Sequence, residues 1–131
     1  MKKLTEQELE IYASDLQKHH ERMLQYYPDM SYIYDITDNY VIMENGHIAS
    51  LICIDMSSKR WHDRFESNYI SRLTSFNGTG RELLDEVVDH LCEISDLPVS
   101  LYCSDDLIGY YEDAGFEIMD TNGDGNNFMT F

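Results

Sequence analysis

The feature that most constrains the fold is a glycine turn between a strand-like run and an amphipathic helix. Residues 67–75 favour a strand, and Gly78-Thr79-Gly80 then breaks the pattern. Apolar residues follow at helical spacing, and Pro98 ends the helix. The pattern therefore predicts a strand, a tight turn and a helix, with a buried stripe made of Leu83, Leu84, Val87, Val88, Leu91 and Ile94.

The flanking segments predict further strands, most of them antiparallel. Asn45-Gly46 separates residues 40–44 from 47–55, and an Asn-Gly pair between two strand-like runs is the strongest short hairpin signal. After the central helix, the pattern predicts a strand at 98–103, a short helix at about 106–113 that ends at Gly115, and two final strands at 116–120 and 127–131.

The first part of the chain predicts one helix over about residues 5–26. Thr5-Glu6-Gln7-Glu8 is a capping box, apolar residues follow at near-helical spacing, and Pro28 ends the pattern. His19 and His20 lie on this helix, but adjacent helical residues point about 100° apart and do not converge on one metal ion. We therefore expect both histidines on the solvent-facing side.

The remaining metal and thiol signals are weak. Asp120-x-Asn122-x-Asp124-Gly125 matches the first half of an EF-hand calcium loop, but Phe131 stands where the loop needs a bidentate Glu. We interpret this segment as a turn between strands. The three cysteines are well separated and odd in number, which predicts reduced core thiols at Cys53, Cys92 and Cys103. We expect no metal site.

The composition predicts one acidic domain over residues 1–131. Its 25 acidic and 9 basic residues give a formal charge of −16, which repels nucleic acid and anionic membranes. No apolar run approaches the ~20 residues of a membrane span, and no signal peptide is evident. We expect a cytoplasmic protein. Three interpretations of this negative charge stay open. It attracts a cationic partner, it serves solubility alone, or it mimics nucleic acid and so binds a DNA-binding protein.

The glycine turn is also the most informative chemical signal. Glycines let a backbone approach a phosphate closely, and the free amides and dipole of a helix N-terminus attract anions. Arg81 in the first turn adds a donor for charge-assisted bonds. The same pattern is common in ordinary tight turns, so both interpretations stay open. A second unit, Tyr110-Tyr111-Glu112-Asp113-Ala114-Gly115-Phe116, ends a short helix with glycine and starts a strand.

Together, and in this order, the two units resemble the GNAT family of N-acetyltransferases over about residues 40–131. That family has an Arg/Gln-x-x-Gly-x-Gly/Ala turn after its fourth strand and a Tyr-x-x-x-Gly-Phe helix end after its fifth. The resemblance implies an α+β (α/β) fold. A single GNAT-like domain would have a mixed, mostly antiparallel sheet flanked by helices, with a splayed parallel strand pair at the cofactor site.

The resemblance also implies an enzyme that transfers acetyl from acetyl-CoA to a primary amine of a cationic acceptor. The fourth strand's edge would pair with the pantetheine arm, the turn amides would hold the pyrophosphate, and a strand amide near Leu73 would polarise the thioester. Tyr111 takes the general acid's place, because a phenol with a pKa of ~10 stays protonated at neutral pH. The implied cofactor-binding residues are Leu73, Thr74, Ser75, Phe76, Asn77, Gly78, Thr79, Gly80 and Arg81.

Departures from the family pattern support an alternative function. The Arg/Gln position falls on Ser75, a frequent Asn falls on Ser104, and the family's first strand is not evident. The alternative is a GNAT-fold protein without transfer activity, an acidic binding or inhibitor protein for a basic macromolecule. A third interpretation is an acidic structural subunit with a chance glycine turn, and a homodimer is left open. The base that accepts the amine's proton stays undecided among Glu44, Asp55, His62 and Glu66.

Overall fold

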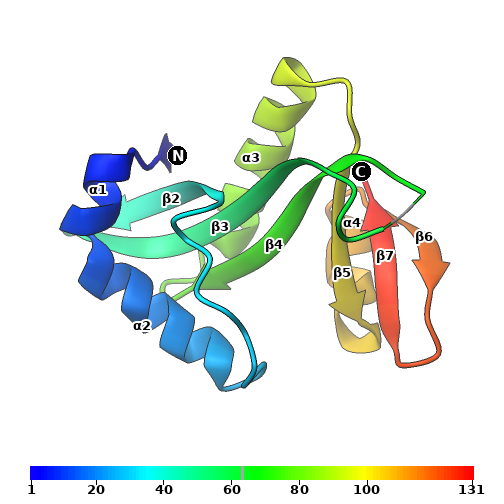
Figure 1. The fold of residues 1–131 in the computed structure, drawn as a ribbon, viewed down its shortest axis with the longest axis horizontal. Helices are drawn as coiled ribbons and strands as arrows, with labels where there is room; N and C mark the ends of the chain where they lie inside the picture. Colours follow the sequence, from blue (N-terminus) through cyan, green and yellow to red (C-terminus); the bar gives the residue numbers. More distant parts are fainter. Residues whose placement is uncertain (63) are drawn as a thin grey trace.

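Seven strands form one mixed sheet within residues 1–62 and 64–131, the part of the chain that the structure, a computed structural model, describes. They are β1 (Lys2–Lys3), β2 (Asp38–Glu44), β3 (His47–Ser58), β4 (Ser67–Ser75), β5 (Val99–Ser104), β6 (Glu117–Thr121) and β7 (Asn126–Thr130). Their order is β1-β2-β3-β4-β5-β7-β6, and all neighbours are antiparallel except β4 and β5 (Figure 1). The predicted mixed sheet is confirmed.

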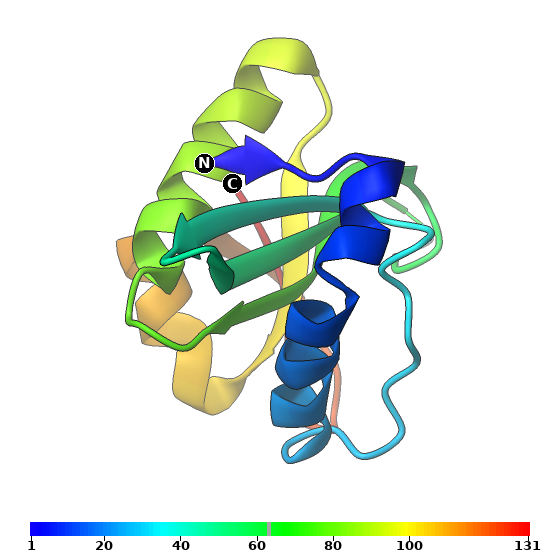
Figure 2. The ribbon, with the colours of Figure 1, turned by 90° about the vertical axis from the view of Figure 1, so that its left-hand side faces the viewer.

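Helices cover both faces of this sheet. They are α1 (Glu6–Ile11), α2 (Ala13–Leu24), α3 (Gly80–Ile94) and α4 (Ile108–Asp113), with a short 3-10 helix η1 (Asp105–Leu107) before α4. The helices α3 and α4 pack on one face, while α1 and α2 lie on the other, as the turned view in Figure 2 shows. Among the helices of the described part, none combines the length and apolar character that crossing a bilayer requires.

Each face of the sheet has its own apolar core. The predicted stripe of α3 is buried against β3, β4 and β5, apart from Ile94 in the last turn, which is exposed. Leu16 of α2 is fully buried against β2 and β3 on the other face. Each fully buried leucine stabilises the fold by about 1.5–3 kcal/mol. Cys53 and Cys103 belong to these cores as expected, whereas Cys92 is exposed, so the expectation for that thiol is wrong.

Two turns confirm the local predictions. Asn45 and Gly46 join β2 to β3 with φ values of +52° and +80°, as a two-residue type I′ hairpin turn requires. The segment that imitates half a calcium loop joins β6 to β7. There the Asn122 side chain accepts hydrogen bonds from the backbone N–H groups of Asp124 and Asn126, at 3.0 and 3.1 Å. This amide arrangement is the turn that the sequence favours.

The N-terminal region differs from the single helix predicted over 5–26. The Thr5–Glu8 capping box is present, but the helix breaks at Tyr12, whose φ and ψ are −100° and 19°. The break redirects the chain, so that residues of both α1 and α2 contact the same core. Ahead of α1, Lys2 and Lys3 pair with Val41 and Tyr40 of β2, which supplies a first strand that the sequence pattern does not reveal.

Both histidines of α2 are buried, so the expectation that they face solvent is wrong. His19 is fully buried, and its Nε2 lies 2.8 Å from the carbonyl oxygen of Ile48. His20 Nδ1 accepts hydrogen bonds from the Arg72 guanidinium at 3.2 Å and the Tyr34 hydroxyl at 3.4 Å. The polar stripe of α2 therefore packs on polar groups of the sheet, a match that only the tertiary structure provides.

Candidate functional site

The sheet opens between β4 and β5, and this opening defines the site. Among the described residues, the two strands pair only at Asn68–Val99 and Tyr69–Ser100. Beyond these pairs the green β4 and the golden β5 separate, as Figure 1 shows. The predicted splay of the parallel pair is therefore confirmed. A cleft of about 1110 Å³ lies at the opening.

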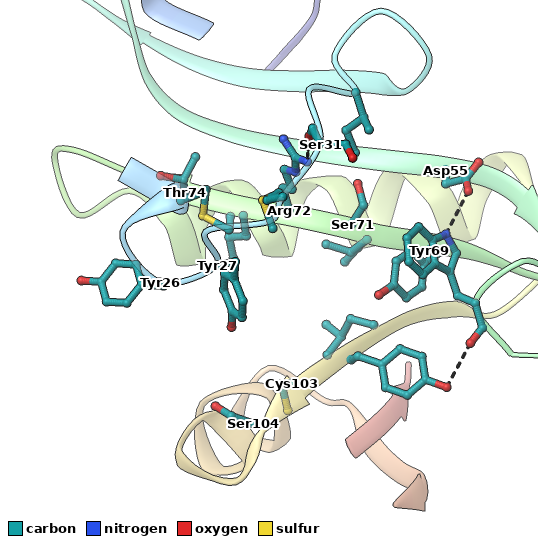
Figure 3. A pocket seen from close by; sticks show the side chains of 18 of the residues that line it. Tyr26, Tyr27, Ser31, Asp55, Tyr69, Ser71, Arg72, Thr74, Cys103 and Ser104 are labelled. Atoms are coloured by element: carbon teal, nitrogen blue, oxygen red, sulfur yellow. Dashed lines mark hydrogen bonds between the residues drawn. The ribbon is translucent and has the colours of Figure 1, made fainter. Parts of the chain in front are cut away.

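Residues from both faces and from both strands line the cleft. They come from the end of α2 and the segment after it, from β4, from the end of β5 and from η1 and α4. Figure 3 shows side chains of β4 facing those of β5 across the gap, with the tyrosines that follow α2 at one side. The labelled residues are Tyr26, Tyr27, Ser31, Asp55, Tyr69, Ser71, Arg72, Thr74, Cys103 and Ser104.

A bulge in β4 sets which of its side chains enter the cleft. The β3–β4 register shifts between Cys53–Arg72 and Ile54–Ile70, so Ser71 is the extra residue. Ile70 and Leu73 both pack in the core below α3, although residues three apart on a regular strand face opposite sides. Arg72 consequently points to the α2 face. Leu73 itself lines the cleft.

The turn after β4 is held by its own side chains. The Ser75 hydroxyl accepts a hydrogen bond from the Gly78 N–H at 3.1 Å and another from the Ser50 hydroxyl at 2.7 Å. Asn77 Oδ1 accepts from the backbone N–H and the hydroxyl of Thr79, at 3.1 and 2.6 Å. Ser75 lines the cleft, so the residue at the family's Arg/Gln position orders the turn instead of offering a cation.

The N-terminus of α3 adjoins this turn. No side chain of the described residues caps the helix at Thr79, and Gly80 packs closely on β4, because a Cβ there would lie 3.3 Å from Ser75 Cβ. The first amides of α3 are thus free of side-chain acceptors, an arrangement that suits an anion. The Arg81 side chain is engaged elsewhere, since its guanidinium pairs with Asp85 at 2.9 Å and with Asp113 at 2.8 Å. Of the predicted set, Phe76 is exposed beside the turn.

Tyr111 lies on α4 and lines the cleft, across the opening from β4. Its ring packs edge-to-face against Phe116 at 5.9 Å, and burial raises the pKa of its phenol above the ordinary value of 10.0. The hydroxyl makes no hydrogen bond to any residue that the structure describes. A protonated phenol therefore stands at the cleft wall, where the resemblance places the general acid.

An aromatic wall at the other end of the cleft was not identified from the sequence. Trp61 stacks on Tyr69 with ring centroids 4.5 Å apart, and its indole N–H donates to Asp55 at 2.9 Å. The Tyr102 hydroxyl donates to the carbonyl of Trp61 at 3.0 Å. The only sequence signal was the tryptophan itself, in a polar segment that pattern analysis treats as a loop.

The four candidate bases lie in different surroundings. Asp55 lines the cleft, whereas Glu44 accepts a hydrogen bond from the Asn77 side chain beside the turn. His62 is buried away from the cleft lining, with its Nε2 3.1 Å from Asp120. Glu66 is exposed and does not line the cleft. The structure therefore brings Asp55, and not the other three, into the cleft with Tyr111.

Comparison with known proteins identifies the fold. No protein-family model matches the sequence, and no curated protein sequence matches it significantly. An acyl-CoA N-acyltransferase from Pseudomonas aeruginosa has a TM-score of 0.70 and 18% identity, over 97% of this chain and 91% of that chain. A GNAT-family acetyltransferase from Listeria monocytogenes gives 0.71 and 13%, over 99% of each chain. The catalytic domain of Tetrahymena GCN5 histone acetyltransferase, in complex with coenzyme A, gives 0.62 and 19%, over 90% and 82%. The chain therefore has the fold of the GNAT acetyltransferases.

Proposed function

We propose that the protein transfers an acetyl group from acetyl-CoA to a primary amine. The observation that carries this proposal is the cleft between the splayed β4 and β5, with a protonated phenol on its wall. The N-terminus of α3 follows β4 just beyond Ser75, the last residue of β4 in the cleft lining. The acyltransferases that share the fold support it, and one of them was solved with coenzyme A. Because fold alone does not set activity, the residues of the cleft must supply each role.

The donor would bind along β4. The strand edge at Leu73, Thr74 and Ser75 faces the splay, where the pantetheine amides would pair with it as a further strand does. The amides at the start of α3 would hold the pyrophosphate. Arg22 lines the same cleft, and its guanidinium lies 4.9 Å from the Phe76 ring beside the turn. It would add the positive charge that Ser75 does not supply.

Transfer would then proceed by direct attack. The amine nitrogen forms a bond to the thioester carbonyl carbon, and the bond from that carbon to sulfur breaks. Tyr111 donates its proton to the departing thiolate, and burial keeps the pKa of this phenol high enough for it to be protonated at neutral pH. The amine's proton passes to a base, for which Asp55 is the candidate that lines the cleft. A β4 amide near Leu73 would polarise the carbonyl oxygen.

The charge distribution suits a protonated amine approaching from solvent. The acidic surplus of the chain attracts cations, and Asp29, Asp55 and Asp106 line the cleft. The same surplus of acidic residues repels nucleic acid and anionic membranes. We therefore propose a cytoplasmic protein whose partner is an amine acceptor.

The test is acetyl-CoA binding measured by calorimetry, with dephospho-CoA and adenosine as controls. Thr79→Asp places a carboxylate at the N-terminus of α3, where it stabilises the helix but repels pyrophosphate. We expect this variant to bind acetyl-CoA about tenfold more weakly, which corresponds to about 1.4 kcal/mol between charges near the surface. Thr79→Asn, the neutral control of the same shape, should bind like the unmodified protein.

The outcomes separate the two functions. Micromolar binding that weakens in Thr79→Asp but not in Thr79→Asn supports the acetyltransferase. Equal affinity in both variants would mean that the phosphates bind elsewhere. Absence of binding at millimolar acetyl-CoA would refute the enzyme. The alternative of an acidic, inactive GNAT-fold binding protein would then be favoured, consistent with the ion-paired Arg81 and with Ser75 in place of a cation.

A further inference from the structure

Arg72 is a buried cation in the cleft with no carboxylate beside it. Its residue is only 4% exposed, yet it lines the cleft. The guanidinium donates to His20 Nδ1 at 3.2 Å and to the carbonyl of Ser31, and it lies over the Tyr34 ring at 5.1 Å. Among the described residues, no Asp or Glu forms an ion pair with it. An arginine has five N–H donors, so this environment leaves donors over.

The hydroxyl of Thr74 is a second unpaired group at the same place. Thr74 is 5% exposed, and its Oγ1 is buried without a hydrogen-bond partner among the described residues. Arg72 and Thr74 are two residues apart on β4, so they face the same side, and both line the cleft. Figure 3 shows them along one strand. A buried hydroxyl without a hydrogen-bond partner, beside a buried guanidinium without a carboxylate, is costly unless a ligand completes both.

A shortage of acidic residues does not explain why Arg72 has no carboxylate partner. The chain has 25 acidic residues for 9 basic ones, and several cations outside the cleft do pair, as Arg64 does with Asp120 and Arg81 does with Asp85. Within the described residues, however, the arginines that line the cleft have no ion pair with a carboxylate. These are Arg22, Arg60 and Arg72. Three arginines without a carboxylate partner among the described residues thus gather at the cleft, which fits anionic ligands.

We propose that the acceptor carries a carboxylate beside its amine, and that Arg72 and Thr74 bind this carboxylate. One guanidinium balances one negative charge, and its planar fork matches a carboxylate. Asp55 supplies the complementary end. Cys53 of β3 is the register partner of Arg72, and Asp55 lies two residues further along β3, so the side chains of Asp55 and Arg72 are on the same face of the sheet. The substrate class is then a small amino acid. Its amine lies toward Asp55 and its carboxylate toward Arg72, which makes the acceptor zwitterionic and not purely cationic. This inference rests on the proposed acetyl transfer.

The experiment compares free L-amino acids with their carboxamides, which keep the amine and lose the charge. Release of the CoA thiol is measured with each proteinogenic L-amino acid and its amide, in the presence of acetyl-CoA. For at least one amino acid we expect kcat/KM to exceed that of its amide by about 100-fold, as a buried charge pair supplies. Arg72→Gln should bring this ratio close to one, mainly by raising KM for the free acid.

A second variant guards against a folding defect in Arg72→Gln. Thr74→Val keeps the shape and removes a hydroxyl that has no partner in the described structure, so the thermal midpoint should not fall. We expect it to lower the acid-to-amide ratio about tenfold. Arg64→Gln removes an exposed arginine that pairs with Asp120 outside the cleft lining, and it should leave the ratio unchanged.

The possible results are distinct. If acetyl-CoA binds and amides are acetylated as fast as free acids, or if no free acid is acetylated, the inference is overturned while the cofactor assignment stands. If Arg72→Gln weakens acetyl-CoA binding and leaves the ratio unchanged, Arg72 serves the cofactor and the inference is also wrong. If acetyl-CoA does not bind, the proposed function itself fails.

Discussion

Gly115 is the residue at which a single added methyl group should be most costly. It follows α4 with a φ of +101°, a conformation that L side chains rarely adopt. A Cβ at this position would lie 2.7 Å from Cε2 of Phe131. The Phe131 ring in turn packs edge-to-face on the buried Phe116, with centroids 5.5 Å apart. Gly115→Ala therefore strains the backbone and displaces an aromatic contact at once.

The two effects can be given sizes. The positive φ costs an alanine about 1–2 kcal/mol, and displacing the ring costs about 1–2 kcal/mol, as mild overpacking does. Alanine also lowers the conformational entropy of the unfolded chain, which stabilises the folded protein by about 0.5–1 kcal/mol. We expect a net loss of about 1–3.5 kcal/mol in the free energy of unfolding. At about 3–4 °C per kcal/mol for a domain of this size, the thermal midpoint should fall by about 3–14 °C.

Urea and thermal unfolding followed by circular dichroism would measure this loss. The matched control is Gly109→Ala within α4, where an added Cβ meets nothing within 4 Å. That change should stabilise the protein by about 0.5–1 kcal/mol through helix propensity. Adding Phe131→Ala to Gly115→Ala removes the obstructing ring, so the methyl group should cost only the backbone part in that background. If Gly115→Ala is as stable as Gly109→Ala, the strain argument is wrong.

Two further predictions concern catalysis and pH. Tyr111→Phe should lower kcat by about 100-fold or more and leave acetyl-CoA binding nearly unchanged, whereas Tyr110→Phe on the adjacent, exposed ring should have little effect. Steady-state rates and calorimetry check this, and full activity in Tyr111→Phe would remove it as the acid. Burial lowers the pKa of His19, and burial together with Arg72 lowers that of His20, so the unfolded chain protonates first as pH falls below 6.5. The free energy of unfolding should therefore decline as pH falls through this range, by at most about 1.4 kcal/mol per pH unit for each histidine. Urea unfolding at a series of pH values measures this slope. His20→Gln should reduce the slope, and an unchanged slope in that variant would contradict the prediction.

The sequence by itself determined most of the elements, because their signals are local. Asn45-Gly46 encodes its hairpin through backbone conformations that few other residue pairs adopt. Residues 67–75 and the helix after Gly80 are where the pattern places them, since strand and helix periodicities are properties of neighbouring residues. The order of these elements, together with the glycine turn and the Tyr-x-x-x-Gly-Phe motif, was sufficient to indicate the fold. Tyr111 of that second motif lies in the cleft.

The tertiary structure decided which polar groups are buried and which face one another. His19 and His20 carry the pattern of a solvated helix face, but the sheet below them offers the Ile48 carbonyl and Arg72. The bulge at Ser71 turns Arg72 away from the core and into the cleft, and no periodicity signals a one-residue shift in strand pairing. Trp61 stacks on Tyr69 of the strand that follows its loop, and the hydroxyl of Tyr102 on β5 donates a hydrogen bond to the Trp61 carbonyl. Such contacts depend on partners distant in the chain, so local patterns contain no information about them.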